Sequence, residues 1–512
     1  MKTKKFLSMA ALALVGAMTV SCSSDDNIID QAQQPESKSN LVTLKTTIGL
    51  AEGTTTRALT ANGVKTFAAD ETMAIVYKNT NGETAVAVSD ALQDNGDITN
   101  EGKSATFTFT LDSPDKDENV TYVYPAAMVN NDGTVKNDAL ASQNGTLASL
   151  ANNLDYCTNS GAWDGENLPS LTLENQLAIL AITLKNSDGS SDITSSITDL
   201  TLSDGTNTYN VTREAVAGPI YVAIRPTTSA TITVTPTVGT KNYKKTLIGK
   251  TYAKGNGYPV SWTMAKVVDY SSEINVPAGD HWYISGTSEY NNITIGDGAT
   301  VTIGGHLLMQ NASIICSGDA TIILADGTDA NIFNGRIKAG PAGTTLTIKG
   351  NTGELNIQAG PSLLGAAIGA SDGDVCGNIE IQGGVITAEG AMAAGIGASN
   401  AKCGNITISG GTVTATCDDG GGAGIGSGSS DTGWCGNITI SGGTVRATGG
   451  SMSAGIGTGE ENGCGDITIK STVTSVTATR GSGASASIGA ANDEDATCGE
   501  VKIEDKSKVT QN

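Results

Sequence analysis

The sequence has few of the residues that catalytic, metal and nucleic-acid sites usually require. Among 512 residues there are 2 histidines and 4 % aromatics, and 30 Lys and Arg stand against 52 Asp and Glu. The formal net charge of −22 argues against nucleic acid as a partner, because phosphate binding depends on clustered Lys and Arg. With no C-x₂-C pair, the usual ligand spacing of zinc is also missing. No His–carboxylate pair is recognisable, so the sequence predicts no enzyme.

Long hydrophobic runs are also lacking, and the one at the start, Phe6 to Met18, is too short to span a bilayer as a helix. It follows a basic start and precedes Ser21-Cys22, which resembles a bacterial lipobox, where the Cys is lipidated and the leader is removed. We therefore predict a signal peptide over 1–21 and a lipidated, flexible tether over 22–40, with Cys22 as the lipidation site. The next residues, 23–26, resemble the acidic export signal of Bacteroidetes surface lipoproteins, which implies the outer membrane and the cell surface. The alternative is an ordinary signal peptide with a leftover Cys.

Glycine is abundant, with 65 residues, and Thr, Ile and Val are frequent, which favours turns and strands. Between 41 and 265 the chain shows short alternating strands such as Thr106 to Leu111. The apolar run Leu177 to Leu184 is long enough to be a central, doubly buried strand. We predict an all-β fold that begins with two β-sandwiches, over 41–170 and 171–265.

Four phrases in this region resemble the fimbrillin family, the pilin-like lipoproteins of Bacteroidetes. They are TTTRA around Arg57, YVYPAA from Tyr122, LTLENQLAILAITLK from Leu171, and GKTYAKGNGYPVSWTM from Gly249. The resemblance implies a pair of transthyretin-like sandwiches. It also implies the assembly of the polymerising members, in which a trypsin-like protease cuts after an Arg near the N-terminus. The lost strand then leaves a groove that a neighbouring subunit fills by β-strand addition.

Arg57 matches the cleaved position of that family, since it follows three Thr residues and precedes Ala58. The resemblance therefore implies protease processing between Arg57 and Ala58. The alternative is an exposed Arg that is never cut.

The last third of the chain repeats one phrase. It reads CGNITISGG at Cys403 and Cys435, with looser copies at Cys376, Cys464 and Cys498, so the steps between these Cys residues are 27, 32, 29 and 34. A second phrase, AGIG or a variant, stands between copies. A period of about 30 residues with three short apolar clusters is typical of a coil of a parallel β-helix. We predict this fold over 273–512, with regular repeats from about 363, and a short connection at 267–272.

Within one repeat, alternation places the apolar residues inward and Thr outward. The expected inward set is Ile406, Ile408, Val413, Ala415, Ala423 and Ile425, and the expected outward pair is Thr407 and Thr414. The phrase also resembles bacterial surface proteins classed as carbohydrate-binding β-helices.

Five Cys share one repeat position, and stacking brings them within reach of disulfide formation in an oxidising location. Vertically stacked side chains point the same way, which strains such a bridge. We favour free, buried Cys as small core residues, with disulfides as the alternative.

The loops between AGIG and Cys-Gly are mostly acidic, and stacking aligns them into a stripe. Its members are Asp372, Asp374, Asp431, Glu460, Glu461, Asp493, Glu494 and Asp495. Such oxygen ligands suit Ca²⁺, but Lys402 interrupts the pattern, so a solvated face is favoured and no cofactor is predicted beyond a possible calcium. Exposed rings are the usual platforms of glycan sites, and the candidates are Trp282, Tyr283, Tyr290 and Trp434. Trp282 and Tyr283 also suit a cap over the first coil.

Taken together, the sequence predicts a non-enzymatic adhesion protein, a fimbrial tip or accessory subunit. Its expected partners are other fimbrial subunits, the outer membrane through the lipid anchor, and a glycan or host surface ligand. The first alternative is a standalone glycan-binding lipoprotein. A polysaccharide-degrading enzyme is less favoured, because a β-helix alone does not imply catalysis.

Overall fold

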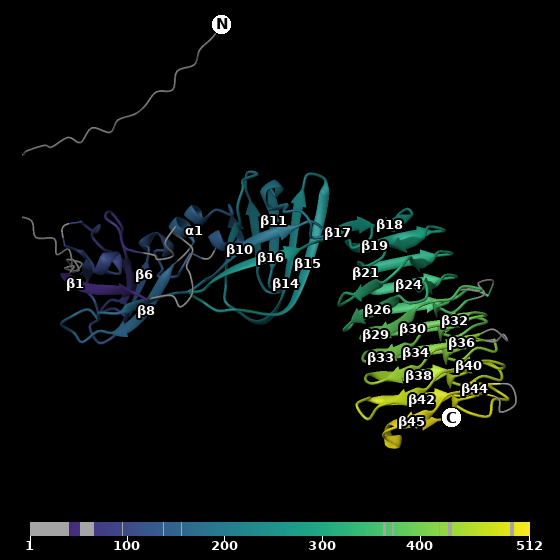
Figure 1. Ribbon diagram of the computed structural model, residues 1–512. Helices are drawn as coiled ribbons and strands as arrows, with labels where there is room; N and C mark the ends of the chain where they lie inside the picture. The colour runs from purple at the N-terminus through teal and green to yellow at the C-terminus, as the bar shows by residue number, and fades with distance from the viewer. Residues whose placement is uncertain are drawn as a thin grey trace, which may run out of the picture.

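The structure is a computed structural model of the whole chain, and it describes residues 40–51, 66–94, 96–136, 138–154, 156–361, 365–370, 373–418, 420–428, 433–491 and 496–512. Strands dominate it, and three bodies follow one another along the chain (Figure 1). The first two are β-sandwiches and the third is a parallel β-helix, so the predicted fold class is confirmed. The helices are short: α1 (Leu147–Asn153) and the 3₁₀ turns Asn100–Gly102, Ala126–Met128, Asp138–Ala141, Thr194–Ser196 and Lys506–Lys508.

The first sandwich is an eight-stranded sheet that folds over an aromatic core. Its order is β3-β2-β6-β8-β9-β1-β5-β4. The bounds are β1 (Leu41–Leu50), β2 (Ala74–Lys78), β3 (Thr84–Val88), β4 (Ile98–Thr99), β5 (Ser104–Asp112), β6 (Asn119–Tyr124), β8 (Cys157–Ala162) and β9 (Thr172–Asn175). Phe107 and Phe109 from β5 pack against Tyr122 and Tyr124 from β6 in one buried cluster with Phe67. Alternation along β5 and β6 produces this core, because every second side chain faces inward.

The second sandwich packs a three-stranded sheet against a larger one. In the small sheet β10 (Ala178–Lys185) lies between β13 (Ile220–Ile224) and β16 (Gly257–Thr263), as predicted for the apolar run. The facing strands are β7 (Ser142–Gln143), β11 (Asp199–Ser203), β12 (Thr208–Thr212), β14 (Thr227–Val238) and β15 (Lys241–Tyr252). Leu150 of α1 joins the same core, so residues 142–154 belong to this sandwich while β8 and β9 belong to the first.

The junction between this sandwich and the β-helix is a strand, which corrects the connection expected at 267–272. β17 (Ala265–Asp269) pairs antiparallel with β15 and parallel with β19 (His281–Glu289). Main-chain hydrogen bonding therefore continues from the sandwich into the first coil. The strand escaped detection because its five residues lie beside turns and carry too little alternation.

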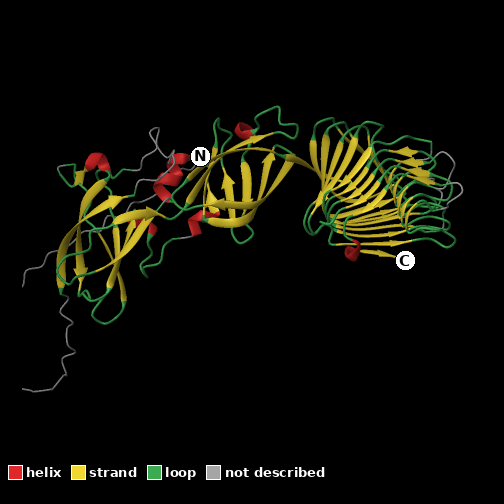
Figure 2. Cartoon of the chain, turned by 60° about the horizontal axis from the view of Figure 1, so that its bottom comes forward, coloured by secondary structure: helices red, strands yellow, loops and turns green. Residues whose placement is uncertain are grey.

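The β-helix contains parallel ladders that run along its whole length (Figure 2). The first two meet in the long β21 (Ala299–Gln310). The first continues through β23 (Ala320–Leu324), β26 (Thr345–Gly350), β29 (Asn378–Ile381), β33 (Ile406–Ile408), β37 (Ile438–Ile440), β41 (Ile467–Ile469) and β45 (Val501–Ile503). The second continues through β24 (Asp329–Phe333), β27 (Glu354–Gln358), β30 (Val385–Gly390), β34 (Thr412–Cys417), β38 (Thr444–Thr448), β42 (Ser475–Thr479) and β46 (Val509–Gln511).

Two further ladders consist of very short strands. The third is a nine-stranded sheet of β18 (Ile274–Val276), β20 (Ile293–Ile295), β22 (Ile314–Cys316), β25 (Ile337–Lys338), β28 (Ile368–Gly369), β31 (Ile396–Gly397), β35 (Ile425–Gly426), β39 (Ile456–Gly457) and β43 (Ile488–Gly489). The fourth is β32 (Lys402–Cys403), β36 (Trp434–Cys435), β40 (Gly463–Cys464) and β44 (Thr497–Cys498). The sequence had predicted three strands per coil, and the regular coils add this fourth one.

The coils become longer along the chain. Successive third-ladder strands from β18 to β25 start at Ile274, Ile293, Ile314 and Ile337, which are steps of 19, 21 and 23 residues. From Ile337 onward the steps are 28 to 32 residues. The added residues form the outer loop and the fourth ladder, so the irregular early coils are a shorter version of the same coil.

The repeat phrase can be explained position by position. The six predicted inward residues of the coil from Ile406 to Ile425 are all buried, and Thr407 and Thr414 face outward. Gly404 follows Cys403 because a Cβ there would lie 2.8 Å from the Gly377 carbonyl oxygen of the preceding coil. Asn405 follows because its side-chain oxygen accepts the Asn437 amide N–H of the next coil at 2.9 Å.

The second phrase ends five third-ladder strands, β28, β31, β35, β39 and β43, in a glycine with a positive φ. Gly426 has φ +141°, and a Cβ there would lie 1.8 Å from the Gly457 carbonyl oxygen. Since L side chains rarely adopt this conformation, both the backbone and the close approach of the coils require Gly.

Candidate functional site

The first candidate is the position of β1 in the first sandwich. β1 lies between β5 and β9, with Leu41 opposite Asp112 and Gly49 opposite Ser104 in the antiparallel pairing. Its contact with β9 is much shorter, at Gly49 and Leu50 only. In the described part of the chain, β1 is therefore the strand through which β5 connects to β9.

The inner face of β1 supplies part of the core. Ile48 is fully buried, and Leu44 and Leu50 pack against the aromatic cluster. The outer face carries Thr43 and Thr47, whose hydroxyls pair with Thr110 and Thr106 on β5 at 3.1 and 3.0 Å. β1 is thus an amphipathic strand, with one face in the core and the other facing outward.

The predicted lipidation and processing residues, Cys22, Arg57 and Ala58, lie outside the described residues. In the sequence Arg57 follows the end of β1 at Leu50. The last described residue on this side is Ala51, whose N–H donates to the Leu173 carbonyl at 3.0 Å.

Two of the four predicted glycan-contact rings lie at the junction. The Lys266 ammonium lies 3.9 Å from the ring centroid of Trp282, and the Lys244 ammonium lies 4.2 Å from that of Tyr283. Lys244 Nζ also donates to the Tyr283 hydroxyl at 3.1 Å, and Trp282 Nε1 donates to Asp280 Oδ2 at 2.8 Å. Their partly buried faces and cation–π partners match the alternative assignment, in which they cap the first coil.

His281 stands beside these rings and holds the same joint. Its amide N–H donates to the Ser187 carbonyl of the sandwich at 3.1 Å, and its Nε2 pairs with Thr302 Oγ1 at 2.8 Å. Burial, together with the nearby Lys245 ammonium, lowers the pKa of His281 from 6.5 to about 4, against the opposing effect of Asp280. The imidazole is therefore neutral at pH 7, and the sequence alone offered no sign of this.

The other two rings, Tyr290 and Trp434, are exposed at 72 % and 42 % and belong to different coils. Trp434 lies on the outward side of the fourth ladder, in register with Lys402 on the preceding coil and Gly463 on the following one. A Cβ on Gly463 would lie 2.1 Å from Trp434 Cζ3, so the ring packs directly over this glycine. The lack of a side chain at 463 is what lets the indole lie against the coil.

Of the acidic stripe, Asp374, Glu460 and Glu461 are described, and the other five members lie outside the described residues. Asp374 pairs with Lys338 at 2.6 Å, and the hydrogen bond and charge of this ammonium lower the pKa of the carboxyl. Among the described residues no three His, Cys, Asp or Glu side chains are grouped so that they could hold a metal ion. Calcium binding therefore remains a prediction that rests on the other five acids.

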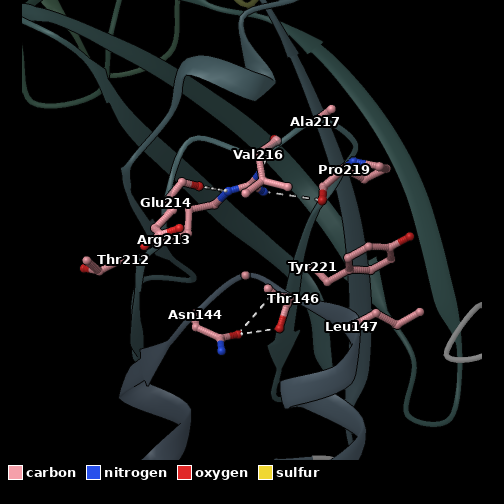
Figure 3. A pocket seen from close by; sticks show the side chains of 11 residues that line it. Asn144, Thr146, Leu147, Thr212, Arg213, Glu214, Val216, Ala217, Pro219 and Tyr221 are labelled. Carbon is pink, nitrogen blue, oxygen red and sulfur yellow. Dashed lines mark hydrogen bonds between the residues drawn. The ribbon is translucent and has the colours of Figure 1, made fainter.

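A pocket of about 510 Å³ that sequence reasoning missed lies in the second sandwich (Figure 3). Its lining includes Asn144, Thr146, Leu147, Arg213, Glu214, Val216 and Tyr221. Arg213 donates to the backbone carbonyls of Glu214, Val216 and Pro219, so its guanidinium holds the loop.

The five repeat cysteines form a column on the inner side of the fourth ladder. Cys403, Cys435, Cys464 and Cys498 pair in register, and Cys376 contacts Cys403. No disulfide joins the five column cysteines in this structure. The hydrogen bonds that Cys376 donates to Cys403 and Cys464 donates to Cys498, together with burial, raise the pKa of Cys376 and Cys464.

Among the residues that the structure describes, none of the helices has the length and apolar character needed to cross a bilayer.

Comparison with known proteins identifies the repeat. The Beta helix repeat family matches residues 379–400, 406–429 and 438–460. No curated protein matches the chain. The β-helix thus contains a recognised repeat. Together, the fold and this comparison define an all-β protein in which a β-helix repeat follows two sandwiches.

Two solved structures resemble the chain over 43 % of its length. One is a candidate cell adhesion protein from Bacteroides fragilis, with 14 % identity, a TM-score of 0.25 and 89 % of that chain covered. The other is a fimbrial assembly protein from Parabacteroides distasonis, with 12 % identity, a TM-score of 0.27 and 91 % of that chain covered.

The pKa of His281 predicts a stability change with pH. Between pH 6.5 and about 4 the unfolded chain binds a proton at this residue that the folded chain does not, so stability falls as the pH falls. Over this range we expect the unfolding free energy of His281→Asn to fall by about 2–3 kcal/mol less than that of the wild type. Denaturant titrations at a series of pH values measure it, with His306→Asn at the exposed histidine as the control. Equal pH dependence in His281→Asn and wild type would contradict the prediction.

Proposed function

We propose that the protein is a non-enzymatic surface adhesion protein, a fimbrial tip or accessory subunit of the fimbrillin type. The observation that carries this proposal is the position of β1 between β5 and β9, directly before the segment with Arg57. Cleavage after Arg57 separates β1 from the rest of the chain. Loss of β1 then uncovers the inner faces of β5 and β9 and opens their edges to a strand from another subunit.

The core supports exchange of this strand. Without Ile48, the aromatic side chains of Phe107 and Phe109 lose part of their cover, so an incoming strand with apolar residues at alternate positions is favoured. Main-chain hydrogen bonds to β5 provide the affinity, and the alternate side chains provide register.

The β-helix supports a terminal rather than a repeating position in a fibre. It follows the second sandwich without a break in main-chain pairing and lies at the far end from β1 (Figure 1). Its last strand, β46, is paired with β42, and the Asn512 carbonyl accepts hydrogen bonds from the Arg480 amide and the Ser487 hydroxyl. This strand is therefore part of the stack, which favours β1 over β46 as the exchanged strand.

The proposed location is the outer membrane at the cell surface, with Cys22 as the lipid anchor. The support for it is the leader, the lipobox-like Cys and the acidic residues that follow. We propose that the protein uses no cofactor. Its proposed partners are other fimbrial subunits and a glycan or host surface ligand that binds at the β-helix end.

The test of strand removal is limited proteolysis of the folded full-length protein. We expect an arginine-specific protease to cut after Arg57 before it cuts at Arg213 or Arg225, and we expect the cut protein to bind a synthetic peptide of residues 41–51. Arg57→Lys is the matched control, because it blocks this protease and leaves the bond open to trypsin. Intact mass measurement identifies the site and fluorescence anisotropy measures the peptide. Resistance at Arg57, or cleavage without peptide binding, would argue against assembly by strand addition.

A second candidate function is that of a standalone glycan-binding lipoprotein, and the geometry of Trp434 favours it. One face of the indole lies on Gly463, while 42 % of the residue is exposed. A flat ring with one face fixed and the other free is a suitable platform for a pyranose ring.

For this candidate we expect Trp434→Ala to weaken binding of a glycan identified on an array by about fivefold to tenfold, the equivalent of about 1–1.4 kcal/mol. Trp434→Phe keeps an aromatic face and should retain most of the affinity. Calorimetry with the wild type and both variants decides it. Unchanged affinity in Trp434→Ala would remove this ring from the binding site.

A further inference from the structure

The cysteine column has the geometry of a site for covalent modification. Cys403, Cys435, Cys464 and Cys498 occupy one register position on four successive parallel strands. In-register neighbours on paired strands lie about 4.8 Å apart at their Cα atoms, within the range that disulfides span. Four of the five column cysteines are nearly or fully buried, and Cys498 at the last coil is half-buried.

The sulfur atoms are not evenly spaced along this column. Cys376 Sγ lies 3.1 Å from Cys403 Sγ, and Cys464 Sγ lies 3.0 Å from Cys498 Sγ. Cys435, between the two pairs, has its Sγ directed at the Gly404 carbonyl oxygen at 3.9 Å. Cys403 also lies within hydrogen-bonding reach of Cys435, but the two Sγ–Sγ contacts near 3 Å are those of Cys376 with Cys403 and of Cys464 with Cys498.

The glycine after each cysteine lets the coils approach one another closely at the cysteine column. A Cβ at Gly404 or Gly465 would meet the backbone of the preceding coil, so these positions remain without side chains. The sulfurs of Cys403 and Cys498 lie beside the Gly377 and Gly465 carbonyls, at 3.8 and 3.7 Å.

We propose that the exported protein carries two disulfides between neighbouring coils, Cys376–Cys403 and Cys464–Cys498, with Cys435 left as a buried free thiol. The location in this proposal rests on the proposed function. The pairing rests on the geometry alone. The two bonds fasten the coils on either side of Cys435 and hold the last coil, which has a neighbour on one side only, to the rest of the stack.

The oxidant is a protein or small-molecule disulfide, such as that of a thiol oxidoreductase or oxidised glutathione. One cysteine thiolate attacks a sulfur of this disulfide, forms a mixed disulfide and releases one thiol. The second cysteine of the pair then attacks its partner's sulfur and displaces the other thiol. Each pair thus gives two electrons and two protons to the oxidant, which leaves as two thiols. Cys498 is the expected first nucleophile of its pair, because it is the most exposed of the five and its pKa is lowered by the hydrogen bond from Cys464.

The test is peptide mapping of the full-length protein isolated from the cell envelope. The protein is quenched in acid, unfolded, alkylated without reduction and digested. We expect crosslinked peptides that contain Cys376 with Cys403 and Cys464 with Cys498, and full alkylation of Cys435. Alkylation of all five thiols, or a crosslink that contains Cys435, would overturn the proposal.

A second arm separates this pairing from the proposed location. Reduced full-length protein made in a cytosol is folded and then treated with oxidised glutathione. The two crosslinks should form again, Cys403→Ser should lose the first and keep the second, and Cys435→Ser should keep both. If the crosslinks form in the glutathione-treated protein but are absent from the envelope protein, the result contradicts both the exported location and the modification in the cell. If they form in neither sample, the pairing fails and the proposed function stands.

Discussion

Main-chain hydrogen bonding between coils in parallel register is the interaction on which the rest of this protein depends. A single coil cannot bury its own inner face, so Ile406, Ile408 and their equivalents are covered only when coils stack. Register then determines every other column, because a slip of one residue would turn the apolar side chains outward. The asparagine oxygens that accept the next coil's amide N–H, the glycines at the close approaches and the cysteine column all follow from this register.

The same bonding joins the β-helix to the second sandwich. β17 pairs with β15 on one side and with β19 on the other, while Lys244 and Lys266 cover the rings of Tyr283 and Trp282. The two bodies therefore share a sheet where the sequence indicated a connection. In the proposed adhesion role, this joint would hold a ligand site on the β-helix at a fixed distance from the second sandwich.

Much of this fold could be predicted from the sequence, because a period of about 30 residues and the alternation of Ile with Thr are strong signals. The fourth ladder could not be, since two residues such as Lys402 and Cys403 are too few to show a period. The surroundings of Trp282 and His281 could not be predicted either, because they depend on lysines from β15 and β17. For the candidate sites, the sequence pointed to Trp434, but only the structure shows Gly463 beneath its ring. The pocket beside Arg213 had no sequence signal beyond a turn.

The central claim is that sandwich and β-helix form one continuous hydrogen-bonded structure through β17. Hydrogen exchange measured by mass spectrometry on peptides that cover 265–270 tests it most directly. Because the amides of a paired strand exchange only when the strand opens, the account predicts exchange as slow as in the peptides of β15 and β21. Exchange in these residues as fast as in an unstructured linker would contradict it.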